Sequence, residues 1–406
     1  MRNYPQAIVT EKAAKALRGG HPWVYGEEVL TLRGAYENGD LVDVLSEKEK
    51  YLGTGFINDH SKIRIRVITR NTNDKMDEAF WIRRLQYAVS YRKTVMGKDF
   101  ACCRLIFGEA DQFPGLTIDR FGPVLVAQVL SLGMERVKHI LFPALLKILR
   151  DMGETIDVIY ERNEAAIREL EGMTCYQDFV QAEGLRTATD GKVIISENGI
   201  QYEVDYINGQ KTGFFLDQKY NRAAVARIAP GKHVLDCFTH TGAFALNAAA
   251  AGAAHVTAVD VSADAIALAR ANAVRNGLEG NMDFVCADVF DLLTEMAKSG
   301  KSPYDFIILD PPAFTKSRST VRNAIRGYKE INLKAMKLLP RGGYLATCSC
   351  SHFMTDTHFC QMMHNAAEDA QVSLRQIEGR QQSPDHPILW NVPETDYLKF
   401  YLFQIV

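Results

Sequence analysis

The sequence predicts an α/β protein whose main domain contains a mostly parallel sheet, and two observations support this. Short apolar runs, typical of buried strands, alternate with helical patterns from residue 233 onward. Four of these runs end in an aspartate, and open α/β sheets bind ligands at the carboxyl ends of their strands. One ligand site is therefore expected along one sheet edge, next to Asp236, Asp260, Asp288 and Asp310.

The turn after Asp236 indicates the kind of ligand. A dinucleotide pyrophosphate requires a Gly-x-Gly-x-x-Gly turn, whereas this turn has the single glycine Gly242. S-adenosylmethionine fits better, because it carries no phosphate and needs a carboxylate for its ribose and a polar group for its adenine amine. We expect Asp260 to bind the ribose and Asp288 the amine. The alternative is a generic α/β domain in which the aspartates only cap helices.

Length and composition restrict the class of protein. A chain of 406 residues predicts two or three domains, and a net charge of −2 excludes a polybasic protein, so RNA binding would need local basic patches. The absence of a long apolar run and of an apolar start predicts a cytoplasmic protein that does not bind membranes. Eight cysteines without paired Cys-x-x-Cys motifs predict thiols and no metal site.

The first part of the chain, residues 1–73, shows short strand patterns separated by glycine-containing turns. Alternation places Lys62, Arg64 and Arg66 on one face of a predicted strand, where they would contact RNA phosphates or simply be solvated. The stretch Gly20-His-Pro-Trp-Val-Tyr25 and the later Gly39-Asp-Leu-Val-Asp-Val44 resemble the PUA-type RNA-binding barrel of some rRNA methyltransferases.

Two further domains are predicted after this one. Residues 74–190 contain a connecting helix and a small α+β domain, whose motifs alone assign no function. Residues 191–406 contain the strands with terminal aspartates. Ahead of the first of these, the polar loop 208–218 would either close over the ligand or form an ordinary surface turn.

Several motifs together resemble the bacterial 23S rRNA cytosine-5 methyltransferase family, which has a PUA domain, a small middle domain and a class I methyltransferase domain. The resemblance covers nearly the whole chain in the right order. It implies a seven-stranded mixed sheet, the cofactor S-adenosylmethionine and 23S rRNA as substrate, and it leaves a homodimer open. It rests on Asn208 to Gln218, Asp236 to Phe244, Asp310-Pro-Pro-Ala-Phe314, Ser349-Cys-Ser351, Asp385-His-Pro387, Phe107-Gly-Glu-Ala-Asp111 and Tyr160-Glu-Arg162.

The same resemblance implies which residues line the cofactor site. They come from the loop before the first sheet strand and from the ends of the strands. By position, they are Lys211, Thr212, Asp217, Gln218, Asp236, Thr241, Gly242, Asp260 and Asp288.

The chemistry of cytosine methylation requires a thiolate. Carbon 5 of cytosine is a weak nucleophile, so an enzyme first adds a thiolate to carbon 6 and later eliminates it. The predicted strand 343–351 supplies Cys348 and Cys350; Cys350 matches the family motif and is the expected nucleophile, with Cys348 in reserve. Both would otherwise be small buried strand residues. Asp310 is expected to hydrogen-bond N3 or the amine of the base.

Basic residues follow the Asp310 motif and would contact RNA phosphates, or form a solvated helix face. The target cytosine is expected to be unpaired or flipped out. Ala313 stands where a different group of RNA cytosine-5 methyltransferases has a second cysteine, so product release needs another group or water. The basic residues are Lys316, Arg318, Arg322 and Arg326.

Three other functions are less consistent with the sequence. Methylation of a guanine nitrogen in rRNA would leave Cys350 without a role. A nicotinamide-dependent dehydrogenase would need the missing phosphate-binding glycines. A ribosome-assembly factor that binds RNA without catalysis would not need the strand-end aspartates and the cysteine.

Overall fold

The computed structural model describes residues 3–300, 302–315 and 317–406, and the chain divides into two compact units. Unit 1 consists of residues 1–194, 204–216 and 384–395, and unit 2 of residues 195–203, 217–383 and 396–406. Residues 384–395 therefore belong to unit 1, although the residues before and after them belong to unit 2. The predicted division at residues 73 and 190 stays a prediction.

Unit 1 begins with a six-stranded sheet in the order β2-β6-β5-β4-β1-β3. Helix α1 (Glu11–Arg18) is capped by Thr10 and packs Ala13, Ala14 and Leu17 into the apolar core of this sheet. The strands are β1 (Gln6–Val9), β2 (Trp23–Val24), β3 (Val29–Arg33), β4 (Leu41–Ser46), β5 (Tyr51–Ile57) and β6 (Ile65–Thr69).

A second, five-stranded sheet of unit 1 has the order β11-β10-β9-β8-β7, and helix α2 (Glu78–Met96) leads into it. The other elements are β7 (Cys102–Phe107), β8 (Leu116–Phe121), β9 (Val124–Val129), α3 (Leu132–Asp151), β10 (Val158–Asn163), α4 (Ile167–Leu170) and β11 (Tyr176–Phe179).

The segment 384–395 is held in unit 1 by a buried polar network. Arg92, which is 0% exposed, donates to the backbone carbonyl of Asp385 at 2.9 Å and forms a bidentate ion pair with Asp111. The Asp385 carboxylate accepts the backbone N–H of Arg104 at 2.8 Å. Breaking one partner of such a network would leave a buried charge uncompensated, so the network holds the segment in unit 1.

β12 (Lys192–Glu197) and β13 (Ile200–Asp205) form a hairpin whose residues 195–203 belong to unit 2, whereas the residues that flank them belong to unit 1. Unit 2 also contains a seven-stranded sheet in the order β16-β15-β14-β17-β18-β20-β19. β16, β15, β14, β17 and β18 lie side by side and are parallel to one another. β20 is antiparallel to both of its neighbours, β18 and β19. The strands are β14 (His233–Cys237), β15 (His255–Asp260), β16 (Met282–Cys286), β17 (Phe306–Leu309), β18 (Tyr344–Ser349), β19 (Leu374–Arg380) and β20 (Lys399–Ile405).

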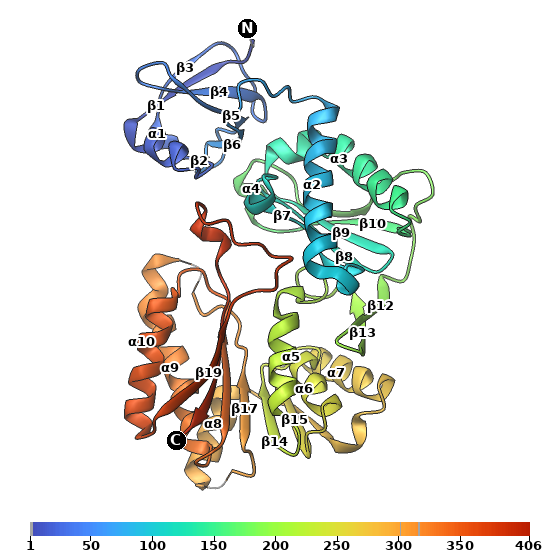
Figure 1. Cartoon of the computed structure of the whole chain (residues 1–406), viewed down its shortest axis with the longest axis vertical. Helices are drawn as coiled ribbons and strands as arrows, with labels where there is room; N and C mark the ends of the chain where they lie inside the picture. The colour runs from blue at the N-terminus through green and yellow to red at the C-terminus, as the bar shows by residue number, and fades with distance from the viewer. Residues whose placement is uncertain (1–2, 301, 316) are drawn as a thin grey trace. The chain divides into compact units, whose positions relative to one another are not determined.

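Helices cover both faces of this sheet (Figure 1). One face packs Leu235, Ile307 and Leu345 against α8, α9 and α10, and α5, α6 and α7 cover the other. The helices are α5 (Lys219–Ile228), α6 (Ala243–Ala250), α7 (Ala263–Arg275), α8 (Val289–Ser299), α9 (Val321–Leu338) and α10 (Asp356–Ala370). This arrangement confirms the predicted class I Rossmann-like fold with a mixed seven-stranded sheet.

Candidate active site

Asp236, at the end of β14, organises the turn that follows it. One carboxylate oxygen accepts the hydroxyl of Thr239 at 2.6 Å and the backbone N–H of Ala245, in the first turn of α6, at 2.9 Å. The other oxygen is buried and has no partner among the described residues. Burial raises the pKa of Asp236 to about 7, although both hydrogen bonds favour the ionised form.

The turn itself approaches its surroundings closely. Phe238, His240 and Gly242 all have left-handed backbone conformations, with φ of 63°, 51° and 82°. A Cβ on Gly242 would lie 3.0 Å from the Cβ of Ala269 in α7, so this position combines a positive φ with tight packing. The hydroxyl of Thr241 is buried and forms no hydrogen bond with the described residues. The turn thus presents unsatisfied polar atoms to a ligand.

Asp260, at the end of β15, is bonded to the same turn. One carboxylate oxygen accepts the backbone N–H of His240 at 2.9 Å and the other accepts that of Ser262 at 3.0 Å. The side chain is half-buried, and each carboxylate oxygen has a second lone pair that the described backbone bonds do not use. Asp260 is therefore placed to bind hydroxyl groups beside the turn.

Asp288 has a different setting. Its side chain is exposed and caps α8 by accepting the backbone N–H groups of Phe290 at 2.7 Å and Asp291 at 3.3 Å. For this aspartate, the helix-capping interpretation therefore describes the observed contacts. Its predicted contact with adenine stays a prediction.

Asp310 follows β17 and lies in a cluster of polar side chains. Its carboxylate accepts the side-chain N–H of Gln218 at 3.0 Å and is hydrogen-bonded to the thiol of Cys348. Burial and the negative charge of Asp217 raise the pKa of Asp310 to about 6, against the opposing effect of Arg222 and of the two hydrogen bonds. This carboxyl group therefore titrates close to neutral pH.

Gln218 and Asp217 contact other side chains of unit 2. Gln218 uses its amide N–H for Asp310 and its amide oxygen for Asn221 Nδ2, at 2.6 Å. Asp217 accepts the hydroxyl of Tyr397 at 2.7 Å. Gln218 thus orients Asp310. The sequence predicted a cofactor contact for Gln218 but not this hydrogen bond to Asp310.

The two cysteines at and just beyond the end of β18 differ in exposure. Cys348 lies within β18 and is 0% exposed, and burial raises the pKa of its thiol well above the usual value. β18 ends at Ser349, so Cys350 lies just beyond the strand and is half-buried. The sequence predicted that both cysteines lie in one strand. This is wrong for Cys350, which lies one residue beyond the end of β18. Thiolates, rather than thiols, are nucleophiles, so the buried Cys348 is poorly suited to attack.

Two predicted cofactor residues, Lys211 and Thr212, belong to unit 1. Thr212 is 1% exposed, and its hydroxyl donates to Asp119 at 2.6 Å; Asp119 also forms a bidentate ion pair with Arg104. Lys211 is exposed, and its ammonium lies 4.6 Å from the ring centre of Phe215. Thr212 therefore anchors the 208–216 loop within unit 1, and a cofactor contact by either residue stays a prediction.

The predicted basic strand is only partly exposed. β6 begins at Ile65, so Lys62 and Arg64 precede it; Lys62 is exposed, and Arg64 is half-buried and paired with Asp59 at 2.8 Å. Arg66 is 9% exposed and paired with Glu171 at 2.6 Å. The prediction that Arg66 lies on an outer basic face is wrong, because the alternation did not reveal that both faces of β6 are buried.

The second basic group lies around the start of α9. Arg322 and Arg326 are exposed on this helix. Lys316 and the side chain of Arg318 lie outside the described part of the structure.

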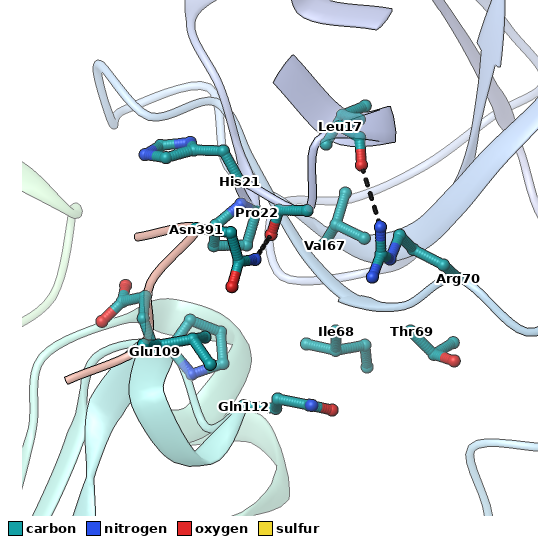
Figure 2. A pocket seen from close by; sticks show the side chains of 13 residues that line it. Leu17, His21, Pro22, Val67, Ile68, Thr69, Arg70, Glu109, Gln112 and Asn391 are labelled. Carbon is teal, nitrogen blue, oxygen red and sulfur yellow. Dashed lines mark hydrogen bonds between the residues drawn. The ribbon is translucent and has the colours of Figure 1, made fainter. Parts of the chain in front are cut away.

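Unit 1 contains a pocket of about 190 Å³ (Figure 2). Its walls come from the end of α1, from β6, from the loop 109–114 and from the segment 384–395. Within it, Asn391 donates to the carbonyl of Gly20, and Arg70 donates to that of Leu17 at 3.3 Å. The sequence did not predict this pocket, because residues almost the whole chain length apart form it.

The described part of the chain offers no candidate for a membrane span or a metal site. None of the described helices is both long and apolar enough to cross a membrane. Among the same residues, no group of three or more His, Cys, Asp or Glu side chains is arranged to hold a metal ion.

The fold and the strand-end site together define a class I methyltransferase. Residues 143–404 match the S-adenosylmethionine-dependent methyltransferase family, and residues 7–70 match a PUA-like domain. The chain belongs to this S-adenosylmethionine-dependent methyltransferase family, and S-adenosylmethionine is its cofactor. The buried, unpartnered oxygen of Asp236 and hydroxyl of Thr241 fit such a cofactor, since a bound ligand can satisfy them.

Relatives with assigned names align along the full length. The ribosomal RNA large subunit methyltransferase I of Klebsiella pneumoniae (strain 342) is 37% identical over 405 residues, covering 99% of both chains. The protein of the same name from Salmonella arizonae is 38% identical over 406 residues, covering 100% of this chain and 98% of the relative.

Solved structures agree with the fold. A Streptococcus mutans chain described as a SAM-dependent methyltransferase superposes with a TM-score of 0.82 at 23% identity, covering 98% of this chain and 99% of the other. The structure of SMU.776 complexed with SAH gives the same TM-score at 22% identity, with the same coverage.

Proposed function

We propose that this chain methylates carbon 5 of a cytosine in large-subunit ribosomal RNA, with Cys350 as the nucleophile. The full-length relatives are named as large-subunit rRNA methyltransferases, which supports the substrate. The choice of cytosine rests on one observation: the half-buried Cys350 follows β18, and Asp310 follows the neighbouring parallel strand β17. A methyltransferase acting on a nitrogen has no use for a thiol in that place.

The thiol chemistry proceeds in two stages. The thiolate of Cys350 attacks carbon 6, a C–S bond forms, and the electron pair of the C5–C6 double bond becomes available at carbon 5. S-adenosylmethionine supplies the methyl group as an electrophile at its sulfonium. Carbon 5 then loses its proton to a base or to water, the C5–C6 double bond forms again, and the C–S bond breaks to release the thiolate.

Asp310 is suited to assist the first stage. Addition at carbon 6 places negative charge on N3 of the base, and a proton donor there stabilises it. A carboxyl group with a pKa of about 6 is mostly ionised at neutral pH, but a much larger fraction of it carries a proton there than of an ordinary aspartate, and that fraction can donate it. Gln218 donates to Asp310 Oδ1 at 3.0 Å, which favours one orientation of the carboxyl group.

The cofactor contacts follow from the strand ends. We assign the ribose hydroxyls to Asp260 and the adenine amine to Asp288, while Asp236, Thr241 and Gly242 shape the turn beside the cofactor. The remaining predicted contacts, Lys211, Thr212, Asp217 and Gln218, come from the loop before α5, where their side chains have the protein partners described above.

RNA contacts are assigned to exposed cations. Lys62 and Arg322 are exposed, and Arg64 is half-buried, so these side chains can reach phosphates. The thiol and Asp310 must reach ring atoms that base stacking covers in a duplex, so the target base is unpaired or flipped out.

The reaction product tests the proposal. Unmethylated large-subunit rRNA is incubated with S-adenosylmethionine and either the wild-type protein or Cys350→Ala, and the nucleosides are identified by mass spectrometry. The proposal predicts 5-methylcytosine with the wild-type protein and none with Cys350→Ala. A methylated guanine formed by both proteins would contradict it and favour nitrogen methylation.

A further inference from the structure

A buried lysine lies beside the segment that carries Cys350. Lys399 is the first residue of β20 and pairs with Ser349 at the end of β18. Its side-chain ammonium donates to the backbone carbonyl of Ser351 at 2.9 Å and to that of Tyr397 at 3.1 Å, and the residue is 5% exposed. The ammonium is thus bound to the residue directly after Cys350.

The charge of Lys399 is incompletely balanced. Buried ammonium groups normally pair with a carboxylate, whereas the hydrogen bonds of this one go to two neutral backbone carbonyls. Burial lowers the pKa of Lys399, and the negative charges of Asp396, Asp356 and an ionised Cys350 oppose that change. The two carbonyl acceptors stabilise the ammonium form, which keeps a positive charge at this place.

The other titratable groups near Lys399 and Cys350 do not supply this positive charge. Asp356, on α10, accepts the hydroxyl of Tyr401 at 2.6 Å, and Asp396 accepts the side-chain amide of Gln381 at 3.0 Å. His352 contacts the backbone carbonyl of Asp396 at 3.3 Å.

Further groups lie near the end of β18. Tyr328, on α9, accepts the hydroxyl of Ser349 at 3.0 Å. The buried Cys348 and Asp310 lie on the strand side of Cys350. Among these groups, Lys399 is the cation bound next to the thiol-bearing residue.

We propose that Lys399 is a positioning residue for the nucleophile: its ammonium favours the thiolate form of Cys350 and fixes the backbone that follows it. A nearby positive charge lowers the pKa of a thiol and so increases the nucleophilic fraction at neutral pH. The catalytic part of this inference rests on the proposed function of Cys350. The electrostatic coupling itself does not.

The alternative is that Lys399 only satisfies the two carbonyl groups. A lysine with that role would affect stability but not the ionisation of the thiol. The pH dependence of Cys350 alkylation separates the two roles, because iodoacetamide reacts with the thiolate and mass spectrometry of the peptide assigns the reaction to Cys350 among the eight cysteines.

The coupling experiment uses the full-length protein without RNA. In Lys399→Met, we expect the pH midpoint of Cys350 alkylation to rise by about one pH unit or more, whereas Lys399→Arg keeps a midpoint close to that of the wild type. Lys334→Met is the matched control, because Lys334 is a partly buried lysine of unit 2 that pairs with Glu330 at 2.5 Å. An unchanged midpoint in Lys399→Met, or an equal rise in Lys334→Met, would overturn the coupling.

A second variant covers the case in which Lys399→Met does not fold. Lys399→Gln keeps a side-chain N–H donor for the two carbonyl groups but carries no charge, so the alkylation midpoint should rise above that of the wild type. A midpoint that stays the same or falls would overturn the coupling.

The catalytic part is tested by the pH profile of single-turnover methylation. We expect the methylation rate to increase with pH, and the pH midpoint of this increase to shift together with the alkylation midpoint in Lys399→Met. In Lys399→Arg, both midpoints should return to those of the wild type. A profile that does not follow the midpoint would overturn the positioning role. Failure of the proposed function is distinguishable, because Cys350→Ala would then still methylate rRNA while the alkylation midpoints of the lysine variants still shifted.

Discussion

Gln218 Nε2 donates to Asp310 Oδ1 at 3.0 Å, which joins the residue before α5 to the residue after β17. The two residues are 92 positions apart in the sequence. Gln218 also binds Asn221, so its amide has a fixed direction and presents an N–H, not an oxygen, to the carboxylate. The contact explains how a carboxyl group with a raised pKa is kept in one orientation beside the proposed position of the base.

The ribose assignment predicts that Asp260→Ala weakens S-adenosylmethionine binding by about 1–3 kcal/mol, the cost of losing a charged hydrogen-bond acceptor. Isothermal titration calorimetry measures the change. Asp264→Ala, which removes an exposed carboxylate in the first turn of α7, serves as control and should bind normally. An unaltered Kd in Asp260→Ala would refute the assignment.

The buried Asp236 predicts a pH-dependent stability. A carboxyl group whose pKa rises from 3.8 to about 7 on folding stabilises the folded state below pH 4, and this contribution is lost as the pH rises through 7. Asp236→Asn does not ionise, so its stability relative to wild type should increase between pH 4 and pH 8, by at most about 4 kcal/mol. Urea unfolding at several pH values measures this; a constant difference would show that Asp236 stays ionised.

The ion pair between Arg66 and Glu171 predicts that Arg66→Ala destabilises unit 1. Removing Arg66 leaves the buried Glu171 carboxylate without its cation and with only the neutral donors Ser61 and Asn58, at a cost of about 3–5 kcal/mol. Arg33→Ala, in which an exposed partner of Glu49 is removed, should cost less than about 1 kcal/mol. Thermal unfolding compares the two variants, and equal melting temperatures would contradict the burial of Arg66.

The exposed cations predict the salt dependence of RNA binding. Removing one cation that binds a phosphate should reduce the slope of log affinity against log salt by about 0.7–0.9, so Lys62→Ala and Arg322→Ala should each lower affinity and flatten the slope. Lys147→Ala is a control, since Lys147 is exposed on α3 and pairs with Asp151. If neither variant changes the slope, these residues are only solvated.

The sequence predicted the sheet of unit 2 well, because parallel strands buried on both faces form short apolar runs that are easy to recognise. The aspartates at the strand ends were located for the same reason. Their individual contacts were not predictable: Asp288 caps a helix, whereas Asp260 accepts backbone N–H groups of the turn. The difference depends on how the following residues turn, and the apolar pattern does not encode this.

The error at Arg66 came from a contact over a long sequence distance. Arg66 pairs with Glu171, 105 residues away, and the sequence also did not indicate that Arg92 binds Asp385, 293 residues away. Alternation along one strand cannot show that another segment covers it. Lys399 was also missed, although a lysine in the otherwise apolar tail was a signal of a buried charge.

Covalent trapping tests the central claim most directly. RNA with 5-fluorocytosine at the target position should form an adduct that cannot eliminate, because fluorine replaces the proton that carbon 5 must lose. We predict a stable protein–RNA adduct with the wild-type protein and with Cys348→Ala, and none with Cys350→Ala. An adduct that persists in Cys350→Ala and disappears in Cys348→Ala would contradict the assignment of the nucleophile.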